Sequence, residues 1–82
     1  VLTSIVALRL SAVLFQLGQL DNALTTLNQV KGESFNARKA ILTGDIQVAK
    51  GDKVAAKNSF EQAQQSGSQL EQQVAKMKLN NL

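Results

Sequence analysis

The stretch 40–60, AILTGDIQVAKGDKVAAKNSF, repeats the pattern of residues 7–27, ALRLSAVLFQLGQLDNALTTL, which lie 33 positions earlier. Small residues correspond to small residues, a turn glycine to a turn glycine, and apolar residues to apolar residues. The matched pairs are Ala7 with Ala40, Ser11 with Gly44, Gly18 with Gly51, Ala23 with Ala56, Leu27 with Phe60, and Val30 with Ala63. No stretch shows the alternation typical of a strand, so the pattern predicts a repeated unit of two helices joined at a glycine.

A repeat of about 34 residues built from two helices is typical of the tetratricopeptide fold. We therefore predict an all-α, tetratricopeptide-like helical repeat with two helix–turn–helix repeats and a C-terminal capping helix. The single domain would span residues 1–82, with repeat one at 2–31, repeat two at 34–65 and the last helix at 69–79. Arrays of this kind present concave surfaces to partners, so the fold predicts a non-catalytic protein–protein interaction domain.

Glycines mark the ends of the predicted helices, because a residue with left-handed backbone geometry commonly ends a helix. The glycines that follow helix-like stretches are Gly18, Gly32, Gly51 and Gly67. The start of the last helix is marked by Ser68 with Glu71 three residues later, which is the pattern of a capping box. The predicted helices are 2–17, 20–31, 34–50, 53–65 and 69–79.

Gly44 lies in the middle of the third predicted helix, where glycine costs about 1 kcal/mol relative to alanine. We interpret it as a packing position. Ser11 and Gly44 would lie where the first helix of each repeat meets the second helix most closely, with Ala23 and Ala56 as their small partners. A bulky residue at any of the four would push the helix pair apart.

The composition excludes most catalytic and metal chemistry. The 82 residues contain no histidine and no cysteine, and the acidic residues are scattered. We therefore expect no catalytic residues, no metal site and no cofactor. The net charge of +3 comes from basic residues interleaved with acids, without aromatic stacking partners, so we expect no nucleic-acid partner.

The first predicted helix is apolar on nearly every side, which is typical of a helix buried on every side. The run 1–17 has polar interruptions and is shorter than the roughly 20 apolar residues of a membrane span. We interpret the chain as the tail of a longer array, with the first helix packing on a preceding repeat. Without that repeat, we expect the exposed helix to allow a homodimer of the fragment.

Three segments resemble the C-terminal part of the YfgM-like family, the ancillary subunit of the bacterial Sec translocon. They are VKGESF at 30–35, LTGD at 42–45 running on to AKGD at 49–52, and MKLNNL at 77–82. The chain departs from the family at three positions. The family often has a basic residue where this chain has Thr43, leucine where it has Gln47 and tryptophan where it has Phe35.

The resemblance implies a bacterial inner-membrane protein with its tetratricopeptide-like domain facing the periplasm. Its membrane contact would come only from an N-terminal anchor that is not in this sequence. The implied partners are Sec translocon subunits and a membrane-anchored periplasmic chaperone of the prolyl-isomerase type, and the implied role is to link protein export to periplasmic chaperones. The alternative is a generic tetratricopeptide adaptor of another multiprotein assembly.

The first helix of each repeat would line the inner face of the array, and this face is the candidate binding site. The residues placed there by the repeat register are Leu8, Arg9, Ala12 and Phe15, followed by Arg38, Ile41, Leu42, Asp45 and Val48. This apolar face would hold an apolar segment or helix of a partner. The alternative is that the C-terminal helix or upstream repeats cover it.

Two features of the candidate site narrow what it could bind: the residues at its carboxylate-binding positions and its inward-facing charges. Some tetratricopeptide domains hold a C-terminal carboxylate with lysine and asparagine, but the required positions here carry Leu8, Ala12 and Ile41. Capture of a chaperone tail by that route is therefore not expected. Arg9 and Asp45 are the charges expected to face inward, where we predict a structural role, such as pairing across helices. The alternative is that Asp45 is simply solvated.

Overall fold

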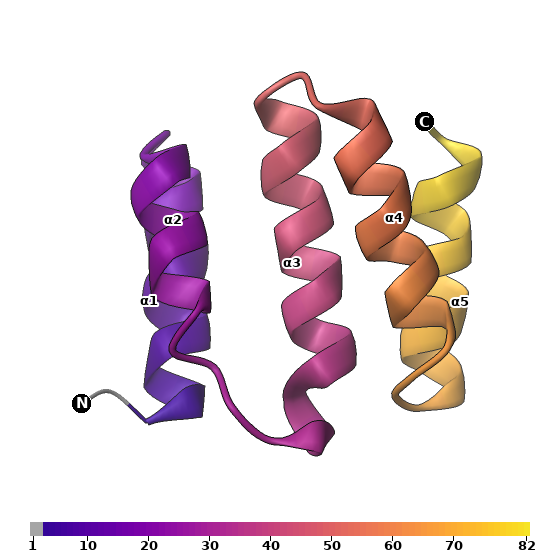
Figure 1. The fold of residues 1–82 in the computed structure, drawn as a ribbon, viewed down its shortest axis with the longest axis horizontal. Helices are drawn as coiled ribbons and strands as arrows, with labels where there is room; N and C mark the ends of the chain where they lie inside the picture. Colours follow the sequence, from indigo (N-terminus) through magenta and orange to yellow (C-terminus); the bar gives the residue numbers. More distant parts are fainter. Residues whose placement is uncertain (1–2) are drawn as a thin grey trace.

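The computed structural model describes residues 3–82, and within this range the chain is all α-helical, as predicted (Figure 1). Its elements follow one another as antiparallel hairpins and contain no strand within residues 3–82. The helices are α1 (Ser4–Gln16), α2 (Leu20–Leu27), the short 3-10 helix η1 (Glu33–Phe35), α3 (Asn36–Ala49), α4 (Lys53–Gln64) and α5 (Gln69–Asn80).

The turns that end α1 and α3 are built in the same way, as the sequence repeat requires. The N–H of Gly18 donates to Phe15 O at 3.0 Å and the N–H of Gln19 donates to Leu14 O at 2.9 Å. In the second copy, Gly51 donates to Val48 O at 3.0 Å and Asp52 donates to Gln47 O at 2.9 Å. Both glycines have positive φ, 80° and 84°. This is the Schellman arrangement, in which glycine takes the left-handed position without steric cost.

The second helix is shorter than the sequence predicts, because it ends at Leu27 instead of Lys31. The N–H groups of Asn28 and Gln29 donate three residues back, to Thr25 O and Thr26 O, so the last turn tightens. Val30 then leaves the helical path and buries its side chain, with 3% exposure. The predicted stripe of helix two therefore ends beyond α2, at a residue that still contributes to the core.

The start of the third helix also differs from the prediction. The turn at 33–35 is the 3-10 helix η1, and α3 begins at Asn36 instead of residue 34. Gly32 has φ 106°, which breaks the chain direction before η1. At the other end of repeat one, the predicted helix 2–17 begins at Leu2, which lies outside the described residues.

The capping box at the start of α5 is confirmed. The N–H of Glu71 donates to Ser68 Oγ at 3.3 Å, and the N–H of Ser68 donates to Glu71 Oε1 at 3.0 Å. These two bonds satisfy backbone groups that a helix N-terminus otherwise leaves without partners.

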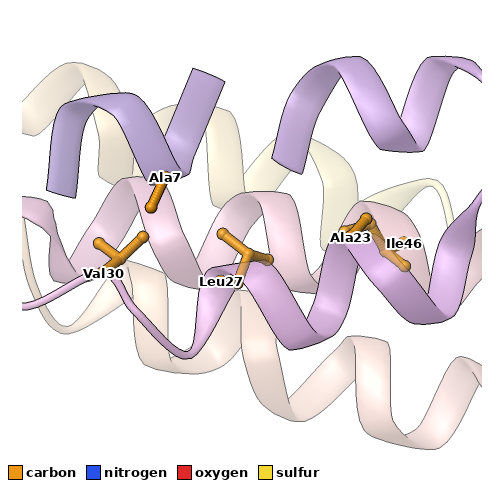
Figure 2. Packing of buried hydrophobic residues seen from close by; sticks show 5 residues of the cluster. All are labelled: Ala7, Ala23, Leu27, Val30 and Ile46. Atoms are coloured by element: carbon orange, nitrogen blue, oxygen red, sulfur yellow. The ribbon is translucent and has the colours of Figure 1, made fainter. Parts of the chain in front are cut away.

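The helices pack as hairpins, α1 against α2 and α3 against α4, with α2 also touching α3 and α5 packing on α4 (Figure 1). The main core cluster contains small residues, which let the helices approach closely (Figure 2). It comprises Ala7, Ala23, Leu27, Val30 and Ile46. At the α1–α2 contact, the buried hydroxyl of Ser11 donates to Ala23 O at 2.8 Å. The small pair expected from the sequence therefore meets through a hydrogen bond.

Gly44 is buried in α3, but its nearest neighbour differs from the expected one. The three atoms closest to a Cβ built on Gly44 belong to the ring of Phe60, one helical turn beyond Ala56 on α4. The sequence repeat therefore predicts that position 44 must be small, but it does not identify the Phe60 ring as the reason. Phe60 is itself 1% exposed, so the ring fills space that a side chain at position 44 would need.

No helix within residues 3–82 is long and apolar enough to cross a membrane.

Candidate functional site

The first helix of each repeat and α5 together line one face of the array, which carries three adjoining hollows. We call this face the inner groove. The hollow between α1 and α3, of about 390 Å³, is lined by Ile5, Leu8, Arg9, Ala12, Arg38 and Leu42. The hollow between α3 and α5, of about 430 Å³, is lined by Arg38, Ile41, Leu42, Asp45, Ser68, Leu70, Glu71 and Val74. The third, of about 450 Å³, is lined by Phe15, Asp45, Val48, Phe60, Lys78, Asn81 and Leu82.

The structure places all of the candidate inner-face residues in this groove. Arg38 and Leu42 belong to both of the first two hollows, and Asp45 belongs to the second and third. The hollows are therefore one continuous surface along α3. Its floor is mainly aliphatic, and its charged groups lie among apolar side chains.

Sequence reasoning missed the far wall of the groove, which α5 supplies. Leu70, Val74 and Lys78 line it, and Leu70 is 70% exposed. Instead of covering the apolar face, α5 stands beside α3 and extends that face. The sequence offers only the spacing of 33 as a signal, because the small residues of the repeat are not kept in α5, where Gln73 follows Ala40 and Met77 follows Gly44.

Extending that period aligns the groove residues in layers, one from each of α1, α3 and α5. Each layer contributes three residues to the lining of the groove. The layers are Ile5 with Arg38 and Glu71, Leu8 with Ile41 and Val74, Ala12 with Asp45 and Lys78, and Phe15 with Val48 and Asn81. By register, α5 therefore occupies the position that α1 and α3 take in their repeats.

The charges within the groove pair differently from the sequence-based expectation. Asp45 accepts a hydrogen bond from Lys78 Nζ at 2.9 Å, so its partner comes from α5 instead of from Arg9. Arg9 forms no ion pair with any residue between 3 and 82. Asp45 pairs with Lys78 because the two residues are 33 positions apart, which places them at equivalent positions on the neighbouring helices α3 and α5.

Glu71 is the one group whose protonation the fold perturbs among those described. The backbone N–H of Ser68 stabilises the carboxylate, and with the Ser68 hydroxyl and the Arg38 charge it lowers the pKa of Glu71 despite partial burial. Arg38 Nε lies 3.7 Å from Glu71 Oε2, an oxygen that is buried and lacks a hydrogen-bond partner. The carboxylate therefore stays charged and faces Arg38 across the α3–α5 hollow.

The opposite face carries a separate hollow of about 570 Å³ between α2, α3 and α4. Its lining is rich in amides and hydroxyls, including Asn28, Asn36, Thr43, Gln62 and Gln65. The hydroxyl of Thr43 already donates to Lys39 O at 2.7 Å. No group of three or more histidine, cysteine, aspartate or glutamate residues suited to a metal occurs in residues 3–82.

Stacked helix hairpins with a groove lined by their first helices define a tetratricopeptide-type interaction domain. A comparison with known protein families supports the same class of fold. The whole chain, residues 1–82, matches the family described as tetratricopeptide repeat-like domain, and the chain belongs to that family.

The relatives found are all named ancillary SecYEG translocon subunit. The protein of Haemophilus influenzae is 96% identical over 82 residues, that of Aggregatibacter actinomycetemcomitans is 55% identical and that of Escherichia coli K12 is 39% identical. These matches cover 99–100% of this chain but only 40% of each relative's length. They confirm the resemblance drawn from the three sequence segments. No solved structure matches the chain.

Proposed function

We propose that this chain is the protein-binding domain of an ancillary subunit of the Sec translocon, and that its inner groove holds a segment of a partner protein. The observation that carries the proposal is the layered lining of the groove. Three helices present equivalent positions to one continuous, mostly aliphatic surface. Such a surface suits a partner helix that inserts an apolar face.

The local structure supports a preformed groove. Matched Schellman turns end α1 and α3, and the Asp45–Lys78 pair ties α3 to α5. The Lys50–Asp21 pair also ties α3 to α2. A groove whose walls are held in this way loses little conformational entropy when a partner binds.

The choice of partner rests on the relatives, whose printed name is that of a translocon subunit. We propose that translocon subunits are the principal partners and that the domain lies at the bacterial inner membrane, facing the periplasm. A membrane-anchored periplasmic chaperone is the second proposed partner, through which the subunit would link export to folding. A generic adaptor role in another assembly is the competing proposal.

Site-specific photo-crosslinking in the natural, membrane-embedded protein tests this function. A photoreactive residue at Val48, in the groove, is compared with one at Val54, which is 75% exposed on α4 and does not line the groove. We expect translocon subunits to crosslink from position 48 and not from position 54. Crosslinks of equal yield from both positions, or none to translocon subunits, would contradict the proposal.

The outer face of α1 offers a second apolar surface, whose residues are Val6, Leu10, Val13 and Leu17. They are 40–67% exposed and recur at helical spacing, so they form one stripe. We propose that this stripe packs against a preceding helical repeat in a longer protein, and that residues 1–82 alone form a homodimer through it. Neither role involves the inner groove.

A further inference from the structure

Two arginines lie at one end of the inner groove, and no acid lines the hollow that they share. Arg9 comes from α1 and Arg38 from α3, and both line the α1–α3 hollow. We propose that this hollow receives an apolar side chain together with an adjacent aspartate or glutamate side chain of the bound partner segment. The proposal rests on the function proposed above and specifies the chemistry of its partner.

The guanidinium groups have unused hydrogen-bonding capacity. Arg9 is exposed, and no hydrogen bond or ion pair of its side chain is found in the described part of the chain. The side chain of Arg38 is 67% exposed, and its one acidic neighbour, Glu71, lies 3.7 Å from Nε. An arginine side chain offers five donors in a planar fork that matches a carboxylate. Both arginines can therefore donate hydrogen bonds to a carboxylate of the partner without losing a hydrogen bond within residues 3–82.

The balance of charge in the groove favours an anion at this end. The groove contains three basic residues, Arg9, Arg38 and Lys78, and two acids, Asp45 and Glu71. Asp45 is engaged by Lys78, and Glu71 faces Arg38. Arg9 is the excess charge, and it shares a hollow with a second guanidinium. A carboxylate bound in this hollow would be attracted by both guanidinium groups.

The remainder of the same hollow is aliphatic. Ile5, Leu8, Ala12 and Leu42 complete its lining, in about 390 Å³. This volume accommodates an apolar side chain beside the charged rim. Neither arginine has a basic equivalent in the other repeats. The positions equivalent to Arg9 carry Leu42 and Ala75, and those equivalent to Arg38 carry Ile5 and Glu71. The acid site is thus confined to the α1 end, which fixes the direction in which a partner segment lies along the groove.

The test uses three synthetic helix-forming peptides that differ at one position. Each has leucines at helical spacing and blocked ends, and the position beside the first leucine is glutamate, glutamine or lysine. Affinity for the natural, full-length protein is measured by fluorescence anisotropy. We expect the glutamate peptide to bind about fivefold more tightly than the glutamine peptide, as for a partly exposed ion pair. The preference should shrink in high salt.

Matched variants locate the effect. The double variant R9Q/R38Q should bind the glutamate and glutamine peptides equally, while circular dichroism shows unchanged helicity. The control K57Q removes an exposed charge of α4 outside the groove and should keep the preference. The reversal R9E/R38E should favour the lysine peptide.

The outcomes separate this proposal from the proposed function. Equal affinities for all three peptides, or a glutamate preference that survives R9Q/R38Q, would overturn the acid site. If translocon crosslinks from position 48 persist in that case, the groove function stands without it. Absence of binding by every peptide, together with absence of those crosslinks, would overturn both.

Discussion

The backbone of Gly44 lies against the aromatic ring of Phe60, with no space between α3 and α4 for a side chain. A Cβ built on Gly44 would lie 2.7 Å from both Cδ1 and Cζ of that ring, and nearer still to Cε1. Carbon atoms of a packed core normally lie about 3.5–4.0 Å apart. Glycine at position 44 is therefore the condition for placing a phenylalanine at position 60.

Gly44→Ala should destabilise the domain even though alanine is the better helix former. The gain in helix propensity is about 1 kcal/mol, whereas a methyl group forced into a filled core typically costs about 1–3 kcal/mol. We expect a net loss of roughly 1 kcal/mol, and a larger loss for Gly44→Leu. Urea denaturation followed by circular dichroism measures it.

A double-mutant cycle with Phe60→Leu checks the assigned cause. The smaller side chain should make Gly44→Ala less harmful than it is beside phenylalanine, with a coupling of about 0.5–3 kcal/mol. Additive effects of the two substitutions would show that the ring is not what excludes a side chain at position 44.

Ser11→Ala should cost about 1 kcal/mol, because it removes a buried hydrogen bond. The Ser11 hydroxyl is fully buried and donates to Ala23 O at 2.8 Å, which joins α1 to α2. Ser34→Ala, at an exposed serine of η1, is the matched control and should change the melting temperature little. An equal loss for both variants would remove the special role of Ser11.

Glu71 should make stability depend on pH in the acid range. Folding lowers its pKa below the ordinary value of 4.5, chiefly through the Ser68 backbone N–H. The stabilisation is therefore fully present above about pH 4.5, and it is lost as the pH falls through the lowered pKa. Glu71→Gln keeps a capping oxygen but no charge, so it should be less stable than the parent at pH 7 by roughly 0.5–1 kcal/mol.

Urea titrations at pH 7 and pH 3 measure this effect. The difference between the parent and Glu71→Gln should be smaller at pH 3 than at pH 7, because the stabilisation by the charged carboxylate is progressively lost as the pH falls below 4.5. The exposed Glu61→Gln serves as the control. A difference that is as large at pH 3 as at pH 7 would assign the effect to packing instead of charge.

Residues 1–82 alone should self-associate through the outer stripe of α1. Val13 and Leu17 are 53% and 67% exposed, and burying such side chains typically gains about 1.5–3 kcal/mol each. Sedimentation over a concentration series should show a dimer that Val13→Glu abolishes. Val54→Glu, at a 75% exposed position of α4, should leave the dimer unchanged. A strict monomer at high concentration would contradict the proposal.

Local features were the most predictable part of this protein. The glycine turns at 18 and 51 and the Ser68–Glu71 capping box depend on residues within a few positions of each other, and each formed as expected. The bounds of α2 and α3 were less predictable. α2 ends at Leu27, and Val30 lies beyond that end but is still buried in the core.

The candidate site could be predicted only in part. Repeat register placed Leu8, Ile41 and Val48 on one face, because residues at equivalent positions of stacked helices line the same surface. It does not give the wall formed by α5, because the small residues that mark the repeat in α1 and α3 are absent from α5.

Helix propensity, capping and periodicity act over short distances, so the number of helices, the glycine turns and the spacing of the repeat follow from the sequence alone. The packing of the helices sets most of the contacts between them. In this packing the ring of Phe60 lies against Gly44, and Asp45 pairs with Lys78 and not with Arg9. Arg9 and Arg38 line the same hollow. These pairings depend on how far each helix is rotated and shifted against its neighbour, and that is fixed only when the whole core packs at once.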